Sequence, residues 1–198
     1  MSNKFLELAV TESVRAAQKQ YYGDARSAPA DAPEDTLSQD EIEFIGSRDS
    51  FYLATITEKG WPYIQHRGGK PGFLNVLNER TLAFADYRGN RQVLSTGNLA
   101  ANDRVALFLM DYPHRARLKI LGRGRVEEAH QHPELVFQLA EADVRRIVER
   151  VFFIDIVAFD WNCPKFITPR YSLDEIRGMV EPLHQRIAEL EAKLKDQS

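Results

Sequence analysis

The sequence has few of the residues that disulfide frameworks and metal sites require. Of its 198 residues, one is cysteine, Cys163, and five are histidine. A single cysteine excludes an internal disulfide, and the scattered histidines give no four-ligand zinc pattern. Neither a disulfide scaffold nor a metal site is therefore expected.

Long hydrophobic runs and an excess of positive charge are missing as well. No stretch is apolar over the length that a membrane-spanning helix needs, and Met1–Val10 lacks the apolar core of a signal peptide. The formal net charge is −3, so the whole chain has no attraction for nucleic acid or an anionic membrane. We expect a cytoplasmic protein that binds neither, in which any anion site comes from local clustering.

Hydrophobic residues are plentiful enough for one packed domain, at 43% of the chain. The residue pattern predicts three parts. Residues 1–36 form an N-terminal arm, in which apolar residues at helical spacing over 6–21 predict one amphipathic helix before a surface connection. Residues 37–170 form the main domain, and residues 171–198 form a C-terminal amphipathic helix.

Short β-branched and aromatic runs dominate the middle part and predict strands. Ser38 and Glu41 first match a capping box, which would begin a short helix ending near Gly46. Six runs then predict strands, the first two joined as a hairpin: 51–57, 61–67, 81–85, 105–110, 115–127 and 151–159. Six strands are too few for two large sheets, so they are expected to close into a small barrel.

The apolar residues of the C-terminal part step alternately by three and four, which is the spacing of a coiled-coil seam. They are Leu173, Ile176, Val180, Leu183, Ile187, Leu190 and Leu194. Pro182 interrupts the seam, because a proline inside a helix removes a hydrogen bond and clashes with the preceding turn. We therefore expect the clean helix to run from about Pro182 to Lys195 and to serve packing or subunit pairing.

The segment Asp86–Gln92 has the composition of an anion site between a strand and a helix. Asn90 suits a helix N-cap and Gly97 a C-cap, which predicts a helix over Arg91–Thr96. Its free backbone N–H groups and the guanidinium of Arg91 could bind a phosphate. On this motif alone, solvated basic residues in a first helical turn are the commoner explanation.

Three other clusters have both a ligand-binding and a structural explanation. Gln65–Lys70 contains two glycines where a flat ring or a phosphate could approach the backbone, or where a strand simply ends in a bulge. Arg117 and Lys119 share one face of their strand, which could meet an anion or only solvent. Asp160–Pro164 offers an indole for stacking and an amide for hydrogen bonds, or a strand-ending turn with a core tryptophan.

In order and spacing, these clusters resemble the pyridoxamine 5'-phosphate oxidase-like superfamily of FMN-binding split barrels. The resemblance covers Phe51–Glu127, and Trp161–Pro164 looks like a bacterial subgroup of predicted flavin-nucleotide-binding proteins. It implies a mainly β, α+β fold: a six-stranded split β-barrel with peripheral helices and a C-terminal helix. It also implies FMN as the cofactor and a homodimer with flavin sites at the subunit interface.

The resemblance extends to individual residues. The family's arginine-to-lysine run falls on Gln65–Lys70, with Gln65 in place of the arginine, and its phosphate clamp falls on Asn90–Gln92. Asp86 stands where the family has a hydroxyl residue. Arg117 stands where it has a glutamine beside the flavin, and a guanidinium there would make reduction easier. The cofactor-binding set that the resemblance implies is Gln65, His66, Arg67, Gly68, Lys70, Ala85, Asp86, Asn90, Arg91, Gln92, Arg117, Lys119, Trp161 and Asn162.

The last part of this sequence differs from that of the true pyridoxamine 5'-phosphate oxidases of the superfamily. Those enzymes carry a terminal Arg-x-x-His substrate segment, whereas this chain runs from Asn162 through Arg170 into a helix. We expect an FMN-dependent oxidoreductase that acts on an unidentified small molecule, with no catalytic residue assigned. The alternatives are a non-catalytic flavin carrier or sensor, a split barrel that binds deazaflavin or haem, and a dimeric scaffold without a cofactor.

Overall fold

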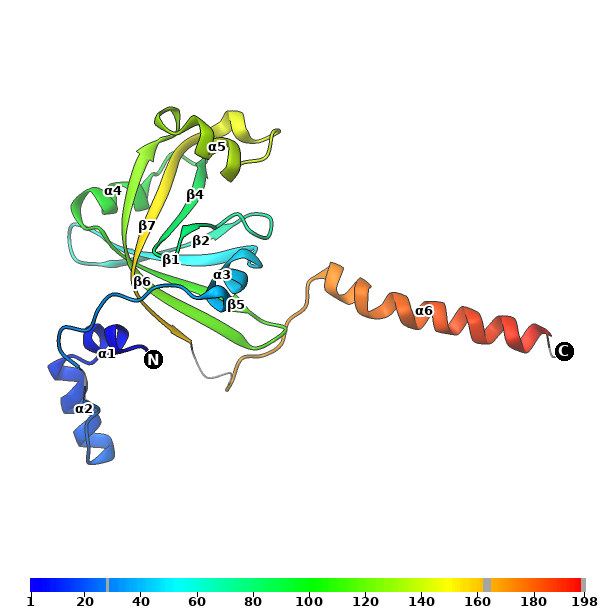
Figure 1. The fold of residues 1–198 in the computed structure, drawn as a ribbon, viewed down its shortest axis with the longest axis horizontal. Helices are drawn as coiled ribbons and strands as arrows, with labels where there is room; N and C mark the ends of the chain where they lie inside the picture. The colour runs from blue at the N-terminus through cyan, green and yellow to red at the C-terminus, as the bar shows by residue number, and fades with distance from the viewer. Residues whose placement is uncertain (28, 162–164, 197–198) are drawn as a thin grey trace. The chain divides into compact units, whose positions relative to one another are not determined.

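The structure is a computed structural model that describes residues 1–27, 29–161 and 165–196 (Figure 1). The predictions made for Asn162 and Cys163 lie outside these residues. The chain divides into two compact units, Met1–Met110 with Arg117–Cys163, and Asp111–Ala116 with Pro164–Ser198.

One seven-stranded sheet carries the fold, in the order β2-β1-β5-β6-β7-β4-β3. Its strands are β1 (Ser50–Ile56), β2 (Pro62–Gly68), β3 (Asn75–Asn78), β4 (Thr81–Tyr87), β5 (Arg104–Asp111), β6 (Ala116–Glu128) and β7 (Val148–Trp161). The described pairings are antiparallel, and the edge strands β2 and β3 do not pair with each other among the described residues. The sheet is thus an open, split barrel with peripheral helices, an α+β fold.

The prediction of six strands was wrong by one, because β3 was not predicted. This strand has only four residues, Asn-Val-Leu-Asn, and pairs with β4 through a register shift. So short a run with asparagine at both ends carries no strand signal of its own. Its pairing depends on the neighbouring strand.

A bulge lets the long strands β6 and β7 curve around the core. Their register shifts between Leu121 and Gly122. A Cβ atom at Gly122 would lie 2.6 Å from the backbone oxygen of Asp155, so only glycine fits there. Bulges of this kind increase strand twist and bending, which suits a barrel wall.

The interior of the barrel is filled by alternate residues of its strands. Phe84 and Phe152 stack with ring centroids 4.9 Å apart, and both are almost fully buried. Strands β4 and β7 are buried on both faces, because α5 (Pro133–Leu139) covers their outer side (Figure 1). Ala83 and Ala85 are small enough to let this helix pack closely.

The N-terminal arm contains two helices instead of the single helix predicted. They are α1 (Asn3–Ala9) and α2 (Glu12–Tyr22). The break comes at Thr11, whose side chain accepts a hydrogen bond from the backbone N–H of Val14 and begins the second helix. The helix cap at Thr11 therefore divides the segment into two helices, although its apolar residues keep a helical spacing across the break.

Two further helices flank the sheet, α3 (Gln39–Gly46) and α4 (Leu94–Ala101), along with the 3₁₀ turns Ala129–Gln131 and Arg145–Ile147. The predicted capping box is confirmed at α3. There the Glu41 carboxylate accepts from both the backbone N–H and the hydroxyl of Ser38, at 2.9 and 2.6 Å.

The second unit contains α6 (Leu173–Asp196), a helix of 24 residues. It begins nine residues before the predicted start and continues through Pro182. Ser172 and Glu175 cap its first turn reciprocally, at 2.7 and 3.2 Å, which explains the early start. The prediction that Pro182 interrupts the helix was therefore wrong, because the helix continues on both sides of it. No helix in the described part of the chain combines the length and apolar character needed to cross a membrane.

Candidate functional site: a polar, arginine-lined cavity

A polar cavity of about 210 Å³ lies between β2, the loop that follows β4 and the start of β7. The structure brings six of the residues predicted from sequence to its wall: Gln65, Arg67, Asp86, Asn90, Arg91 and Gln92. Tyr87, Ser95, Glu149 and Arg150 line it too.

Strand β2 supplies two of these side chains, because successive side chains of a strand point to opposite faces of the sheet. Gln65 and Arg67 are two residues apart, so they lie on one face, and both are half-buried against the cavity. Arg67 pairs in regular register with Phe51 and reaches the cavity from an undistorted strand. The hydroxyl of Ser95 donates to Gln65 at 3.0 Å, which ties β2 to α4.

The centre of the cavity wall is a buried carboxylate held between two guanidinium groups. Asp86 is 7% exposed. Its Oδ1 accepts from Nη1 of Arg67 at 2.7 Å, and its Oδ2 accepts from Nε of Arg150 at 3.0 Å. Arg150 also pairs with Glu149 at 3.1 Å, whereas Nε of Arg67 is buried with no hydrogen-bond partner in the described structure. The arrangement therefore leaves one buried donor unused.

The loop between β4 and α4 has an unusual backbone. Arg91 and Val93 have φ angles of 62° and 44°, in the left-handed region. A β-branched residue such as valine rarely adopts it, so the loop stores strain of the sort that gathers at functional sites. Such strain persists only where the surrounding structure enforces it.

The helix predicted over Arg91–Thr96 is therefore wrong in position. Helix α4 begins at Leu94, since the left-handed residues before it interrupt a helical path, and Gly97 lies inside it. Asn90 caps a turn instead of a helix, with its Oδ1 accepting from the backbone N–H of Gln92 at 3.0 Å. Arg91 is exposed at the cavity's edge.

Several predicted residues lie elsewhere. Lys70 pairs with Glu141 at 2.5 Å beside a second cavity of about 590 Å³, and the hydrogen bond and charge of Glu141 raise the pKa of Lys70. Gly68 ends β2, Ala85 packs beneath α5, and His66 faces away from the polar cavity toward the ring of Tyr52, 5.6 Å distant. These residues do not meet the cavity within one chain.

The second cluster of predicted cations and aromatics also lies apart from the cavity. Lys119 pairs with the buried Asp160 at 2.9 Å. Arg117 lies over the ring of Phe108 at 5.6 Å, and its Nε is buried without a hydrogen-bond partner in the described chain. Trp161 is anchored separately, as part of the contact between β7 and α3.

Trp161 donates its indole N–H to Glu41 at 2.5 Å. Burial alone would raise the pKa of Glu41, but hydrogen bonds from Ser38 and Trp161 outweigh it and hold that pKa below its usual 4.5. Glu41 is thus a charged, structural carboxylate that joins the helix cap to the last strand.

Residues 37–154 match the family model described as pyridoxamine 5'-phosphate oxidase. The chain belongs to this family. No similar sequence was found among curated proteins.

Several solved structures are similar to the chain over about two thirds of its length. HupZ from Group A Streptococcus is 11% identical with a TM-score of 0.50, covering 69% of this chain and 98% of its own. A putative pyridoxamine 5'-phosphate oxidase from Lactobacillus delbrueckii is 19% identical with a TM-score of 0.49, covering 63% and 93%. An FMN-binding protein from Syntrophomonas wolfei is 11% identical with a TM-score of 0.44, covering 63% and 88%. At these identities, the likeness to HupZ shows the fold alone.

In this member of the pyridoxamine 5'-phosphate oxidase family, sequence reasoning missed Arg150. It lies directly across from Asp86 in the pairing of β4 with β7, 64 residues away along the chain. Nothing near Arg150 in the sequence marks it, apart from its place at the start of an apolar strand. Tyr87 was also missed: it lines both cavities, and burial followed by the charges of Glu141 and Asp143 raises its pKa.

Proposed function

We propose that this chain binds FMN, with the flavin's phosphate in the polar cavity, and that it acts as a flavin-dependent oxidoreductase on a small molecule. The carrying observation is the set of three arginines, Arg67, Arg91 and Arg150, around one small cavity. Two carboxylates, Asp86 and Glu149, share that wall. The cations therefore outnumber the anions, and a phosphate would supply the missing negative charge.

The residues present fit a phosphate in two further ways. The unused Nε donor of Arg67 is buried, and an unpaired buried donor is costly unless a ligand oxygen accepts from it. Left-handed backbone, as at Arg91 and Val93, is the conformation in which successive N–H groups can form an anion-binding concavity. Asp86 would act as a positioning residue, because it holds Arg67 and Arg150 on both of its oxygens.

The size of the cavity supports a site that two subunits complete. Cavities that enclose a whole small molecule have volumes of about 300–1,000 Å³, and this one has about 210 Å³. It suits the phosphate end, so the ring system needs another surface. An apolar hollow lined by Tyr52, Ile64 and Phe108 lies on the outer face of the sheet, and the exposed Ile64 there supports coverage by a second copy in a homodimer.

FMN would supply the redox chemistry as a two-electron carrier. The chain's own residues would bind and orient it: arginines neutralise the phosphate, and Asp86 fixes two of them. Arg117 would stabilise negative charge near the reduced ring, as its family position implies. An Arg117→Ala variant is then expected to have a lower flavin midpoint potential, and an unchanged potential would remove this role.

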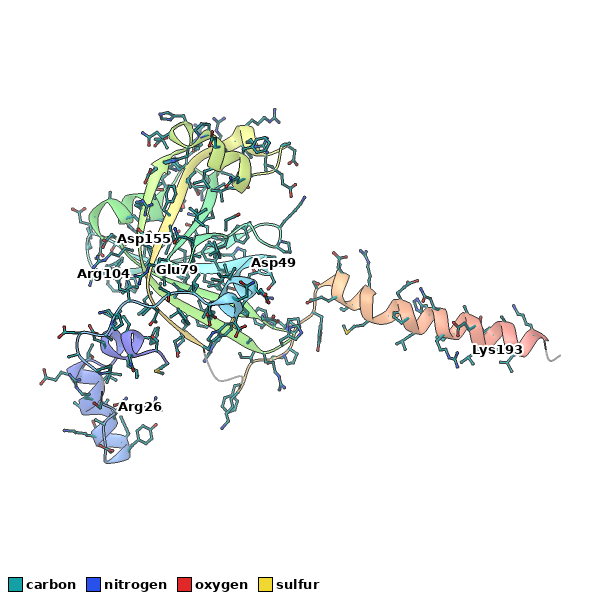
Figure 2. All side chains as sticks on the ribbon, in the orientation of Figure 1. Arg26, Asp49, Glu79, Arg104, Asp155 and Lys193 are labelled. Atoms are coloured by element: carbon teal, nitrogen blue, oxygen red, sulfur yellow. The ribbon has the colours of Figure 1, made fainter. Side chains whose placement is uncertain are left out.

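The test compares FMN with riboflavin, which lacks the phosphate. Purified protein is mixed with each flavin, freed of excess and measured by visible absorption, with affinities from titration. Because a charged hydrogen bond contributes about 1.5–3 kcal/mol, the Arg91→Ala variant should bind FMN roughly 10- to 100-fold more weakly and riboflavin unchanged. Arg104→Ala, an exposed arginine outside the cavity at the start of β5, is the control and should bind as wild type (Figure 2).

Two outcomes would overturn the proposal. If the purified protein shows no flavin absorption after FMN is added, FMN is not its ligand. An absorption spectrum of haem or deazaflavin in the purified protein would identify that molecule as the ligand instead. Equal affinity for FMN and riboflavin would show that the phosphate contributes nothing.

A further inference from the structure

Helix α6 carries an apolar side that the described structure leaves uncovered. Leu173, Leu183 and Ile187 are 73%, 61% and 53% exposed. In proteins, most of the stability of a helix comes from packing of its apolar side against another surface. The helix therefore needs a partner surface.

The continuity of α6 through Pro182 makes its apolar side one seam. In heptad positions a to g, Leu173, Val180, Ile187 and Leu194 occupy a, and Ile176, Leu183 and Leu190 occupy d. Pro182 then falls at c, which points away from an a/d seam. The backbone bond that proline removes is to Gly178, at the outward position f. The residue expected to break the seam thus leaves it intact.

The residue types on the seam specify the kind of partner. Valine and isoleucine at a, with leucine at d, favour two parallel strands over higher oligomers. That combination occurs in the two consecutive heptads that contain Val180, Leu183, Ile187 and Leu190. A second copy of the same helix satisfies it at each layer.

Charges beside the seam favour the same orientation. Arg186 at g would face Glu191 at the following e position of a parallel partner, an attractive pair that occurs twice by symmetry. In an antiparallel pair, g faces g, so Arg186 and Lys193 would crowd positive charge along one edge. Figure 2 shows Lys193 extending from α6 near its C-terminal end. Within its own helix Arg186 bonds to Glu189 at 2.8 Å, so part of its charge is already shared.

We propose that α6 pairs with α6 of a second copy of this chain as a parallel, two-stranded coiled coil. This inference does not depend on flavin binding. A parallel pair has a two-fold axis along the coil, which is compatible with a symmetric homodimer of barrels. The coil would tether the two barrels and raise their effective concentration for each other, which keeps a two-subunit site assembled in dilute protein.

Disulfide trapping in the full-length protein tests the pairing. In a Cys163→Ser background, Leu183→Cys and Leu190→Cys each place a thiol at a d position, where an in-register partner brings the same residue within disulfide reach. Ala192→Cys, at the outward position f, is the matched control. On mild oxidation both d variants should form covalent dimers on the order of tenfold faster than the control.

Any other result of the cross-linking experiment contradicts the proposal. An antiparallel pair is symmetric about a single layer, so at most one of the two d variants would cross-link. Equal rates for all three variants would mean that the helices are only near each other. No cross-linking, in protein whose barrel unfolds normally by tryptophan fluorescence, would mean that they do not pair.

A charge exchange tests the orientation independently. Glu191→Arg places arginine against Arg186 of the partner and should slow trapping at Leu190→Cys severalfold. Adding Arg186→Glu restores opposite charges across the pair and should recover the rate. If the double variant traps no faster than Glu191→Arg alone, Arg186 and Glu191 do not face each other.

Discussion

The barrel and helix α6 use the same kinds of apolar side chain but differ in where those side chains find partners. Phe84 and Phe152 belong to strands distant in sequence, and they bury each other almost completely. Leu183 and Ile187 are neighbours on one helix and remain more than half exposed. A regular local pattern can therefore specify an element without providing its burial, which must come from elsewhere in the chain or from another molecule.

The largest expected effect tests how much the buried rings of the barrel contribute to its stability. Phe152→Ala removes a fully buried ring and leaves a cavity, so it should lower the free energy of unfolding by about 4 kcal/mol in urea titration. Phe137→Ala removes an equally large ring that is 65% exposed and lies under Arg145 at 3.9 Å. Its loss should be less than about 1 kcal/mol. Similar losses for both variants would contradict the burial of Phe152.

The next effect concerns charge held inside the barrel wall. Asp86→Ala leaves Arg67 and Arg150 without their shared carboxylate and should destabilise the barrel by about 3 kcal/mol. Asp155→Ala is the matched exposed change on β7, where Arg125 is the ionic partner at 2.6 Å (Figure 2). It should cost less than about 1 kcal/mol, since solvent screens the pair. Chemical denaturation of both variants measures the difference.

A smaller effect links α3 to the end of β7 and depends on pH. Because hydrogen bonds lower the pKa of Glu41 in the folded state, its ionised form adds stability above the usual 4.5, and this is lost as pH falls through the folded pKa. Glu41→Gln should cost about 1 kcal/mol at neutral pH. The gap from wild type should narrow in urea titrations below pH 4.5, and a gap independent of pH would show that the charge of Glu41 is unimportant.

The smallest expected effect tests whether α6 stands apart energetically. Leu190→Ala should change the unfolding free energy of the barrel by less than about 0.5 kcal/mol, because Leu190 is an exposed residue outside the barrel's unit. The two tryptophans, Trp61 and Trp161, belong to the barrel's unit and report its unfolding by fluorescence. A loss above about 1 kcal/mol would show that α6 contributes to the barrel's core and would break the comparison.

Much of the fold follows from local sequence. The first hairpin and the last strand appear where alternating or apolar runs predict them, in β1, β2 and β7. Ser38 and Glu41 mark the start of α3 correctly. The errors fall where a local signal was weak or outweighed: four-residue β3, the Thr11 cap and the left-handed residues before α4.

The site was harder to predict than the fold. The clusters around Gln65 and Arg91 were picked out in sequence, and the structure brings parts of both to one cavity. Lys70 was grouped with them because it ends the segment that resembles the family's arginine-to-lysine run, yet it lies beside the other cavity with Glu141. Strand β2 ends at Gly68, and the chain changes direction there, so Lys70 does not reach the cavity that Gln65 and Arg67 line.

Sequence by itself determined the features that depend on near neighbours. The two-residue period of β2 places Gln65 and Arg67 on one face, and the three-and-four spacing from Leu173 to Leu194 places an apolar seam on α6. Tertiary structure alone decided that Asp86 meets Arg150, and that the backbone at Arg91 turns left-handed. The reason is that strand neighbours are selected by burial of the whole core. A pair formed across two strands therefore depends on all the side chains that set their register.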